Sequence, residues 1–202
     1  MNNIIWKTSA EDSKELELFI GEVFLRKVKR KLFSTLFTQD SGELPCDLFE
    51  SAEKRAAESF AFALLARGPR FSSQLIEKME QQLISREAAL HAAQVCEERG
   101  YLNDHDLMIR FAERKSDRSL RYIVGLLRTK TGLKPEDIRR ILAKNMPDPA
   151  ITIRSLLEKK YRKVDLSCAK ARNKLFQALL RRGFDFTAIR SALTSDTDYR
   201  TR

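Results

Sequence analysis

The 202-residue sequence has few of the residues that interrupt regular structure, with 7 Gly and 5 Pro. This scarcity argues against a loop-rich β-sandwich and against a disordered chain. The longest unbroken apolar run, at 60–66, is far shorter than the roughly 20 residues that a membrane-spanning helix needs. The first residues lack a basic segment followed by a long apolar one, so we expect no secretory signal. We therefore expect a soluble, cytoplasmic protein without a membrane partner.

Cysteine is also scarce. The three cysteines, Cys46, Cys96 and Cys168, are far apart and form no C-x-x-C pair. An odd number of cysteines without a secretory signal predicts reduced intracellular thiols rather than a disulfide framework. Cys96 lies on an apolar helical stripe, and we expect it to be buried.

The motifs of several common enzyme classes are missing. There is no G-x-x-x-x-G-K-[ST], no G-x-G-x-x-G and no H-E-x-x-H, which leaves phosphate-loop, dinucleotide-binding and zincin chemistry without support. The Asp104-His105-Asp106 run does not suit a metal, because consecutive helix residues point about 100° apart. The two aspartates are expected to stabilise a helix N-terminus. With no set of nucleophile, base and orienting group, we predict no enzymatic activity, no cofactor and no metal.

Basic residues are concentrated in the second half of the chain. Residues 1–108 hold 14 basic and 18 acidic side chains, whereas residues 109–202 hold 24 basic and 10 acidic ones. Such asymmetry predicts a polyanion or an acidic protein surface as partner. The alternative for any one cluster is a solvated helix face, and for Arg181 and Arg182 it is a contact with a helix dipole.

The candidate partner-binding and DNA-binding residues are Arg121, Arg128, Lys130, Arg154, Lys159, Lys160, Arg162, Lys163, Lys170, Arg172, Lys174, Arg181 and Arg182.

The first 47 residues differ from the rest. Residues 4–6 form a short apolar run, and Leu16, Leu18 and Ile20 alternate with their neighbours at the period of a strand. A turn at Gly21 leads into a third apolar run at 23–25. We predict a small antiparallel element of two or three strands, followed by a loop at 40–47.

From residue 48 onward, every segment has helical periodicity. Apolar residues follow Gly132 and Gly183 at offsets of +1, +6, +9 and +10, and a fainter copy follows Leu83, so that the copies start about 50 residues apart. A period of this length predicts tandem three-helix repeats, although a chance match among amphipathic helices is the alternative. Each glycine can supply a positive φ at a tight turn. Leucine cannot do so without strain, so we expect the first turn to be built differently.

The predicted fold is mainly all-α, with tandem three-helix repeats forming an elongated curved array and a short N-terminal extension that contains a small β-hairpin. The predicted parts are an extension at 1–47, repeats at 48–103, 104–147 and 148–195, and a disordered tail at 196–202.

Four segments match one known family in order and spacing. Residues 72–79 are similar to its Arg-Ser-x2-Glu-Leu-x2-Lys-Leu segment, and residues 98–104 to its Leu-x-Gly-Leu-Leu-Asp-Asp segment. Residues 120–138 are similar to its second repeat, and residues 179–184, Leu-Leu-Arg-Arg-Gly-Phe, to its C-terminal Arg-Arg-Gly-Phe signature. The sequence thus resembles the RecX family of bacterial regulatory proteins, which bind the RecA recombinase.

The resemblance covers about residues 50–193, with three departures. Leu83 replaces the glycine of the first repeat, Phe71 stands where an arginine is usual, and Thr129–Thr131 makes the second turn about one residue longer. These departures concern local turn geometry more than the fold.

The resemblance implies a monomeric, elongated helical protein that lies in the groove of a RecA–DNA filament and slows filament growth and ATP turnover. It would act in recombination, DNA repair and the SOS response, and the basic half would contact single- or double-stranded DNA. The alternative is a helical-repeat nucleic-acid-binding protein with helix-turn-helix-like units. Against it, the helix after Gly183 offers Asp185 and Arg190 but no row of base-reading side chains. A generic helical scaffold would leave the charge unexplained.

Overall fold

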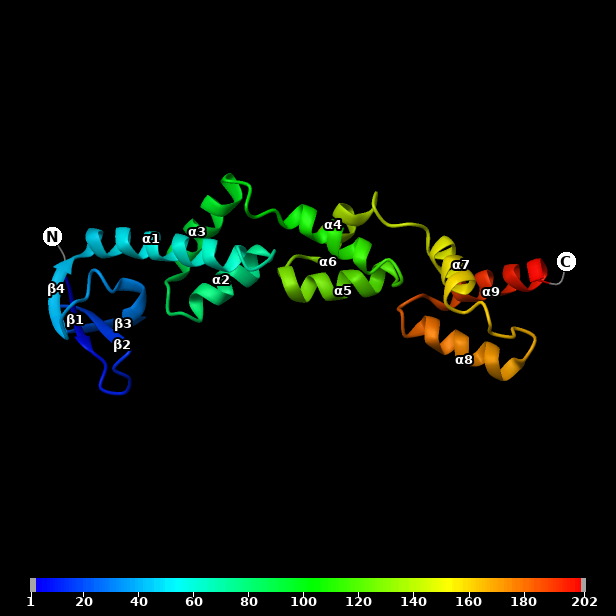
Figure 1. Cartoon of the computed structure of the whole chain (residues 1–202), viewed down its shortest axis with the longest axis horizontal. Helices are drawn as coiled ribbons and strands as arrows, with labels where there is room; N and C mark the ends of the chain where they lie inside the picture. The colour runs from blue at the N-terminus through cyan, green and yellow to red at the C-terminus, as the bar shows by residue number, and fades with distance from the viewer. Residues whose placement is uncertain (1–2, 201–202) are drawn as a thin grey trace. The chain divides into compact units, whose positions relative to one another are not determined.

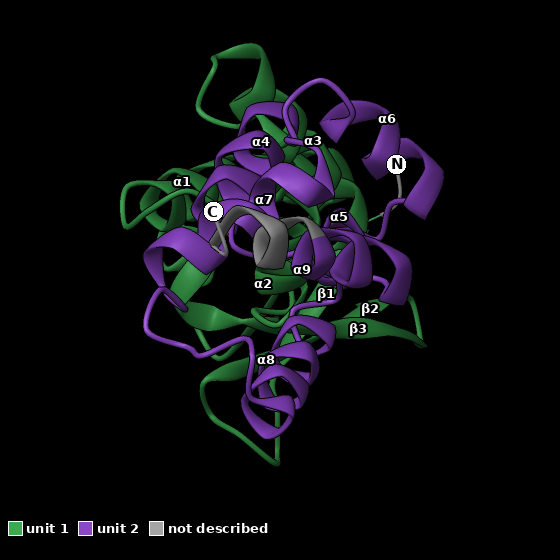
Figure 2. Ribbon diagram, turned by 90° about the vertical axis from the view of Figure 1, so that its right-hand side faces the viewer, with its two compact units in different colours: residues 1–104 green, residues 105–202 purple. Residues whose placement is uncertain are grey.

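The structure is a computed structural model that describes the backbone of residues 3–200 and the side chains as far as Thr194. The chain forms two compact units, residues 1–104 and 105–202, which Figure 2 shows in different colours. The first unit contains a β-sheet and three helices. The described part of the second unit contains helices and no strand. Its first helix, α4, starts at Asp104, the last residue of the first unit. The prediction of a mainly helical fold with a small antiparallel element at the N-terminus is confirmed.

The N-terminal sheet has four antiparallel strands in the order β3-β2-β1-β4, at the blue end of Figure 1. Its strands are β1 (Asn3–Thr8), β2 (Glu15–Ile20), β3 (Val23–Lys29) and β4 (Ser41–Pro45), with a 3₁₀ turn η1 (Arg30–Phe33) after β3. The register pairs Ile4 with Ile20 and, on the other edge of β1, with Leu44. One face of the sheet is buried, since Leu16 and Leu18 are fully inaccessible while their neighbours are not.

The predicted loop at 40–47 is wrong, because most of it forms β4 and the start of a helix. Ser41–Pro45 has no strand-like alternation, and it becomes a strand by pairing with β1. Gly42 lies opposite Trp6, and a Cβ on Gly42 would come within 2.5 Å of the indole ring. Only a glycine lets the strand pass over this buried ring, a long-range requirement that the local sequence does not reveal.

The first helical group consists of α1 (Cys46–Leu65), α2 (Ser72–Glu80) and α3 (Arg86–Glu98). Helix α1 starts directly after Pro45, with no side-chain cap. Small buried side chains line the contact of α1 with α3, among them Ala57, Ala61 and Ala92. Cys96 is buried in the same core, as predicted. Small residues let the two helix axes approach closely.

A buried carboxylate joins the sheet to this helical group. Glu53 of α1 is 4% exposed, and its two oxygens accept hydrogen bonds from the Ser85 backbone N–H and hydroxyl, each at 2.8 Å. The Arg26 guanidinium of β3 pairs with the same carboxylate at 2.6 Å. Arg26 also donates to the Leu83 carbonyl at 3.0 Å. Strand β3, helix α1 and the turn before α3 are therefore held at one point.

Helices α4–α9 follow in two further groups of three. Their bounds are α4 (Asp104–Arg114), α5 (Leu120–Thr131), α6 (Pro135–Leu142), α7 (Pro149–Lys159), α8 (Ala169–Leu180) and α9 (Phe186–Arg200). Helix α9 continues through residues 196–200, where we expected a disordered tail, because no glycine or proline follows Gly183 to end it. Residues 201–202 of that tail lie outside the described residues. The predicted boundaries of the three repeats stay a prediction.

A residue in the left-handed conformation separates the second and third helices of every group. The three are Leu83, Gly132 and Gly183, with φ of 62°, 72° and 87°. In each group the third helix begins three residues later. Our expectation that the first turn is built differently is wrong: Leu83 adopts the glycine-like conformation. The strain, about 1–2 kcal/mol for a left-handed L-residue, is tolerated where Arg26 holds the Leu83 carbonyl.

The apolar offsets after this residue correspond to the core. The +6 residues, Ala89, Ile138 and Ile189, are all fully buried. The +10 residues are buried as well, whereas the +1 position is buried in the first and third groups and 37% exposed at Leu133 in the second. The repeated sequence pattern thus reflects one packing arrangement used three times.

Replacing Gly183 by alanine tests the third turn against the second. A Cβ on Gly183 would lie 2.6 Å from Ser119 Oγ and 2.8 Å from Tyr122 Cβ, whereas a Cβ on Gly132 would meet nothing within 4 Å. Gly132→Ala carries only backbone strain, and we expect it to cost about 1 kcal/mol of unfolding free energy. Gly183→Ala adds a steric clash, and we expect about 3 kcal/mol. Urea unfolding followed by circular dichroism measures both, and equal losses would contradict the close packing at Gly183.

Candidate functional site

The predicted basic residues lie on three helices of the second unit and in the two segments that follow α7 and α8. Arg121, Arg128 and Lys130 belong to α5, and Arg154 and Lys159 belong to α7. Lys160, Arg162 and Lys163 follow α7. Helix α8 contains Lys170, Arg172 and Lys174, and Arg181 and Arg182 come directly after it. All are exposed except Lys130, which is half-buried, and Arg182, which is buried.

On α5 and α8 the cations follow the solvent-facing side of the helix. Arg121 and Arg128 are seven residues apart on α5 and exposed, whereas Ile123, Val124 and Leu127 of the same helix are buried. On α8, Lys170, Lys174 and Arg181 have spacings of four and seven residues, which places them on one stripe. The stripe faces away from the buried Leu175 and Leu179. Each helix therefore presents a row of positive charge outward.

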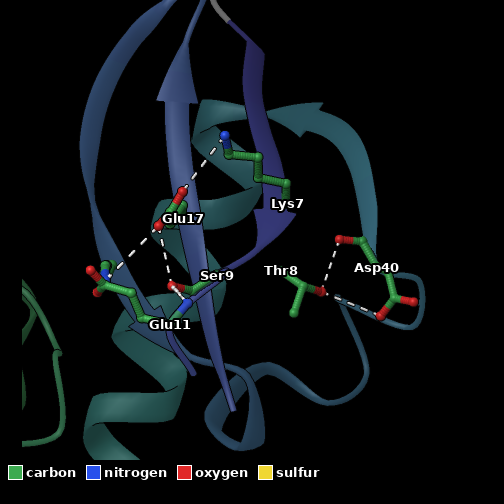
Figure 3. A network of polar contacts seen from close by, with 7 residues as sticks. Lys7, Thr8, Ser9, Glu11, Glu17 and Asp40 are labelled. Carbon is green, nitrogen blue, oxygen red and sulfur yellow. Dashed lines mark hydrogen bonds and ion pairs between the residues drawn. The ribbon is translucent and has the colours of Figure 1, made fainter. Parts of the chain in front are cut away.

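The exposed cations of this set make no ion pair with any residue whose side chain is described. The ion pairs of the second unit involve Arg118, Arg139, Arg140, Arg182 and His105 instead. In the first unit, by contrast, basic residues are paired around the sheet. Figure 3 shows the ion pair of Glu17 with Lys7, whose Nζ lies 3.7 Å from the Glu17 carboxylate. Lys27 pairs with the same carboxylate, and the Ser9 hydroxyl donates to it. Positive charge is thus largely compensated at the sheet and left uncompensated on α5, α7 and α8.

Arg182 has a different role from its neighbour Arg181. Its side chain is 8% exposed and donates to both the carboxylate and the carbonyl oxygen of Asp117, the latter at 2.9 Å. Burial by itself would raise the pKa of the Asp117 carboxyl. The hydrogen bond and charge of Arg182, together with Arg118 and Lys160, outweigh burial and hold that pKa below its usual value. Because this guanidinium is used inside the unit, we leave Arg182 out of the exposed cationic set.

The same contact involves Ser119 at the start of α5. The Ser119 hydroxyl donates to the Gly183 carbonyl at 2.7 Å, and its backbone N–H donates to the Arg182 carbonyl at 3.1 Å. Ser119 Oγ also accepts from the Tyr122 N–H as the helix cap. Sequence reasoning missed this residue: a serine before an apolar helix signals a cap, but its partners 63 and 64 residues away give no local signal.

The histidines and the aspartates around His105 are explained by the fold. Asp104 accepts from the Ser72 N–H at 2.8 Å and from its hydroxyl, both within the first unit. His105 lies 3.5 Å from Asp106, and His91 lies 3.1 Å from Glu58. No group of three metal-ligating side chains occurs in the part of the chain that the structure describes.

Among the residues described, no helix combines the length and apolar character needed to cross a bilayer.

The third helical group matches a known protein-family model. The family model described as RecX, third three-helix domain, matches residues 152–193. The match spans most of α7, all of α8 and the first half of α9, together with the Arg-Arg-Gly-Phe segment. A search of curated proteins gave no match.

Two solved structures are similar over most of the chain. The crystal structure of a regulatory protein RecX has 16% sequence identity and a TM-score of 0.55, with 93% of this chain and 97% of that chain covered. The crystal structure of RecX from Lactobacillus salivarius has 16% identity and a TM-score of 0.57, with coverage of 72% and 97%. Identity at this level shows a shared fold. Together with the family-model match, it confirms the resemblance to RecX found in the sequence.

Neutralising Asp117 tests the buried contact with Arg182. We expect Asp117→Asn to lower the unfolding free energy at pH 7 by about 1–2 kcal/mol, less than a fully buried pair would cost, because Asp117 is 45% exposed. The native pKa is lowered from 3.8, so the charge stabilises the fold above that pH and its contribution disappears on further acidification. The difference in stability between the two proteins should therefore be smaller at pH 3 than at pH 7. A difference that is the same at both pH values would contradict the ion pair.

Removing four charges at the end of α7 and in the loop after it tests the cationic surface. Because each phosphate contact releases counterions, the combined variant Lys159→Gln, Lys160→Gln, Arg162→Gln and Lys163→Gln should bind single-stranded DNA more weakly and with a smaller salt dependence. The slope of log K against log salt should become less negative by roughly 0.7 for each phosphate that the variant no longer neutralises. Fluorescence anisotropy from 50 to 200 mM salt measures it.

The matched control removes the same charge from exposed first-unit positions that form no ion pair in the described structure, with glutamine at Lys31, Arg55, Arg67 and Lys78. An equal change of slope in both variants would point to net charge alone.

Proposed function

We propose that this protein, which has the RecX fold and matches the RecX third three-helix domain, is a non-enzymatic regulator that binds RecA filaments on DNA in the cytoplasm. It inhibits their ATPase and strand-exchange activities. Its partners in this proposal are the RecA filament and the DNA within it, and it acts as a monomer without a cofactor.

The observation that carries the proposal is the uncompensated positive charge on α5, α7 and α8. Exposed cations that form no ion pair repel one another, and an anionic partner relieves that repulsion. A nucleoprotein filament offers both phosphate and acidic protein side chains along its length. Arg121, Lys174 and Arg181 stand on outward faces of two helices, where a long surface can reach them. Attraction of this kind also speeds the encounter of the two partners.

The repeated helical groups suit a polymeric target. Groups of three helices in series supply several weak contacts on one chain, and each bound contact raises the effective concentration of the next. Binding of this kind can block filament growth or ATP turnover without any reaction on the regulator itself. The absence of catalytic motifs from the sequence agrees with a regulatory role.

The second candidate is a nucleic-acid-binding protein that reads DNA with helix-turn-helix-like units. In such units the N-terminal part of the second helix enters the major groove. Here the turn before α9 packs on α5 through Gly183 and Ser119, and Asp185 caps α9 by accepting from the Ala188 N–H at 2.8 Å. A carboxylate at that helix end disfavours its insertion between the two phosphate backbones that border the major groove of duplex DNA. These contacts favour the filament regulator.

Titration of RecA ATPase activity on single-stranded DNA tests the proposed function. We expect inhibition at less than one molecule per RecA subunit, together with loss of strand exchange, and no ATPase or nuclease activity of the protein alone. The variant with glutamine at Lys159, Lys160, Arg162 and Lys163 should need a higher concentration for half-maximal inhibition. The variant with glutamine at Lys31, Arg55, Arg67 and Lys78 should match the unmodified protein. Normal ATPase and strand exchange with the protein in excess would refute the proposal.

A further inference from the structure

A groove of about 640 Å³ lies between α5 and the turn that joins α8 to α9. One wall is the α5 face that contains Arg121, Tyr122, Gly125 and Leu126. The other consists of Leu180 and residues 183–186. Gly125 lacks a side chain, and a Cβ there would meet nothing within 4 Å, so the groove is open on the α5 side. Both walls belong to the second unit.

An exposed aromatic ring stands in this groove. Phe186 is 59% exposed, although a phenylalanine usually buries most of its surface. Its ring packs edge to face on Phe176, with the centroids 4.9 Å apart and the planes at 66°. The contact holds the ring in a fixed orientation while one side stays accessible. The ring is therefore prearranged to stack on a planar group from outside.

One arginine lines the groove, and two further exposed arginines belong to the elements that form its walls or directly follow them. Arg121 lines the groove, and Arg128 follows it seven residues later on the outward stripe of α5. Across the groove, Arg181 comes directly after Leu180 on the outward stripe of α8. None of these three arginines has an ion pair with a described side chain. The one acidic residue of the lining, Asp185, accepts from the Thr187 hydroxyl at 2.5 Å and from the Ala188 N–H as the cap of α9.

We propose that this groove binds single-stranded nucleic acid, with one base stacked on Phe186 and the neighbouring phosphates contacting Arg121 and Arg181. An accessible aromatic ring in a groove that an arginine lines matches the chemistry of a nucleotide, which has a flat π-face and charged phosphates. Binding of single strands combines these two elements, aromatic stacking and a cationic path. The inference deepens the proposed function, since it names the ligand class of one part of the cationic surface.

The test compares two ligands that carry equal charge. One is oligo-dT, and the other is an oligonucleotide of the same length made of abasic residues. Stacking on one aromatic side chain contributes roughly 5- to 150-fold in affinity. We expect Phe186→Ala to weaken oligo-dT binding within that range and to leave binding of the abasic strand unchanged. Phe186→Tyr, which keeps the ring, should retain the affinity for oligo-dT.

Ile151→Ala is the matched control, because Ile151 of α7 is a large apolar side chain with 61% exposure that does not line the groove. It should bind both strands like the unmodified protein. Circular dichroism and urea unfolding of Phe186→Ala verify that removal of the ring, which packs on Phe176, leaves the helices folded.

Two outcomes would overturn the inference. Equal weakening of both ligands by Phe186→Ala would mean that the ring supports the cationic surface but stacks on no base. Unchanged binding of oligo-dT, with weaker binding of RecA in the absence of DNA, would mean that the groove holds protein. ATPase inhibition separates this inference from the proposed function: if Phe186→Ala binds oligo-dT normally and still inhibits RecA, the regulator proposal stands and the stacking site does not.

Discussion

The helical part of the chain depends on one backbone constraint: a left-handed residue between the second and third helices of each group. That conformation sets the corner at which the third helix begins, and it brings the apolar residues at +6 and +10 into the core. In the first and third groups the same residue also accepts a hydrogen bond from a neighbouring segment. The Leu83 carbonyl accepts from Arg26 of the sheet, and the Gly183 carbonyl accepts from Ser119 of α5. In these two groups the turn that contains the left-handed residue is therefore also the attachment point of a neighbouring segment.

These attachment points divide the charged residues into two classes. Glu53 with Arg26, and Asp117 with Arg182, are used inside the fold, where an unpaired buried charge would be costly. The exposed cations of α5, α7 and α8 form no ion pair with described residues, so they are the ones available to a partner. Arg181 and Arg182 illustrate the division. They are adjacent in the sequence but point about 100° apart around the helix, and only one of them reaches Asp117.

Much of the fold could be predicted because it is periodic. The alternation at Leu16 and Leu18 predicted a strand, and the offsets after Gly132 and Gly183 predicted buried helix faces. The errors occurred where a distant contact outweighs local preference. Strand β4 forms through pairing with β1, and α1 already starts at Cys46, within the segment that we predicted to be a loop. Leu83 adopts a conformation that its own side chain disfavours, with Arg26 bound to its carbonyl.

For the candidate site, the sequence by itself determined the excess of positive charge in the second half, the helices that carry it and the similarity to RecX. Periodicity and composition are local properties, so they can be read without coordinates. Only the tertiary structure decided which cations are exposed, which arginine is buried, and that Phe186 lies in a groove beside Arg121. These features join residues more than 60 positions apart, and their packing depends on how separate helices meet in space.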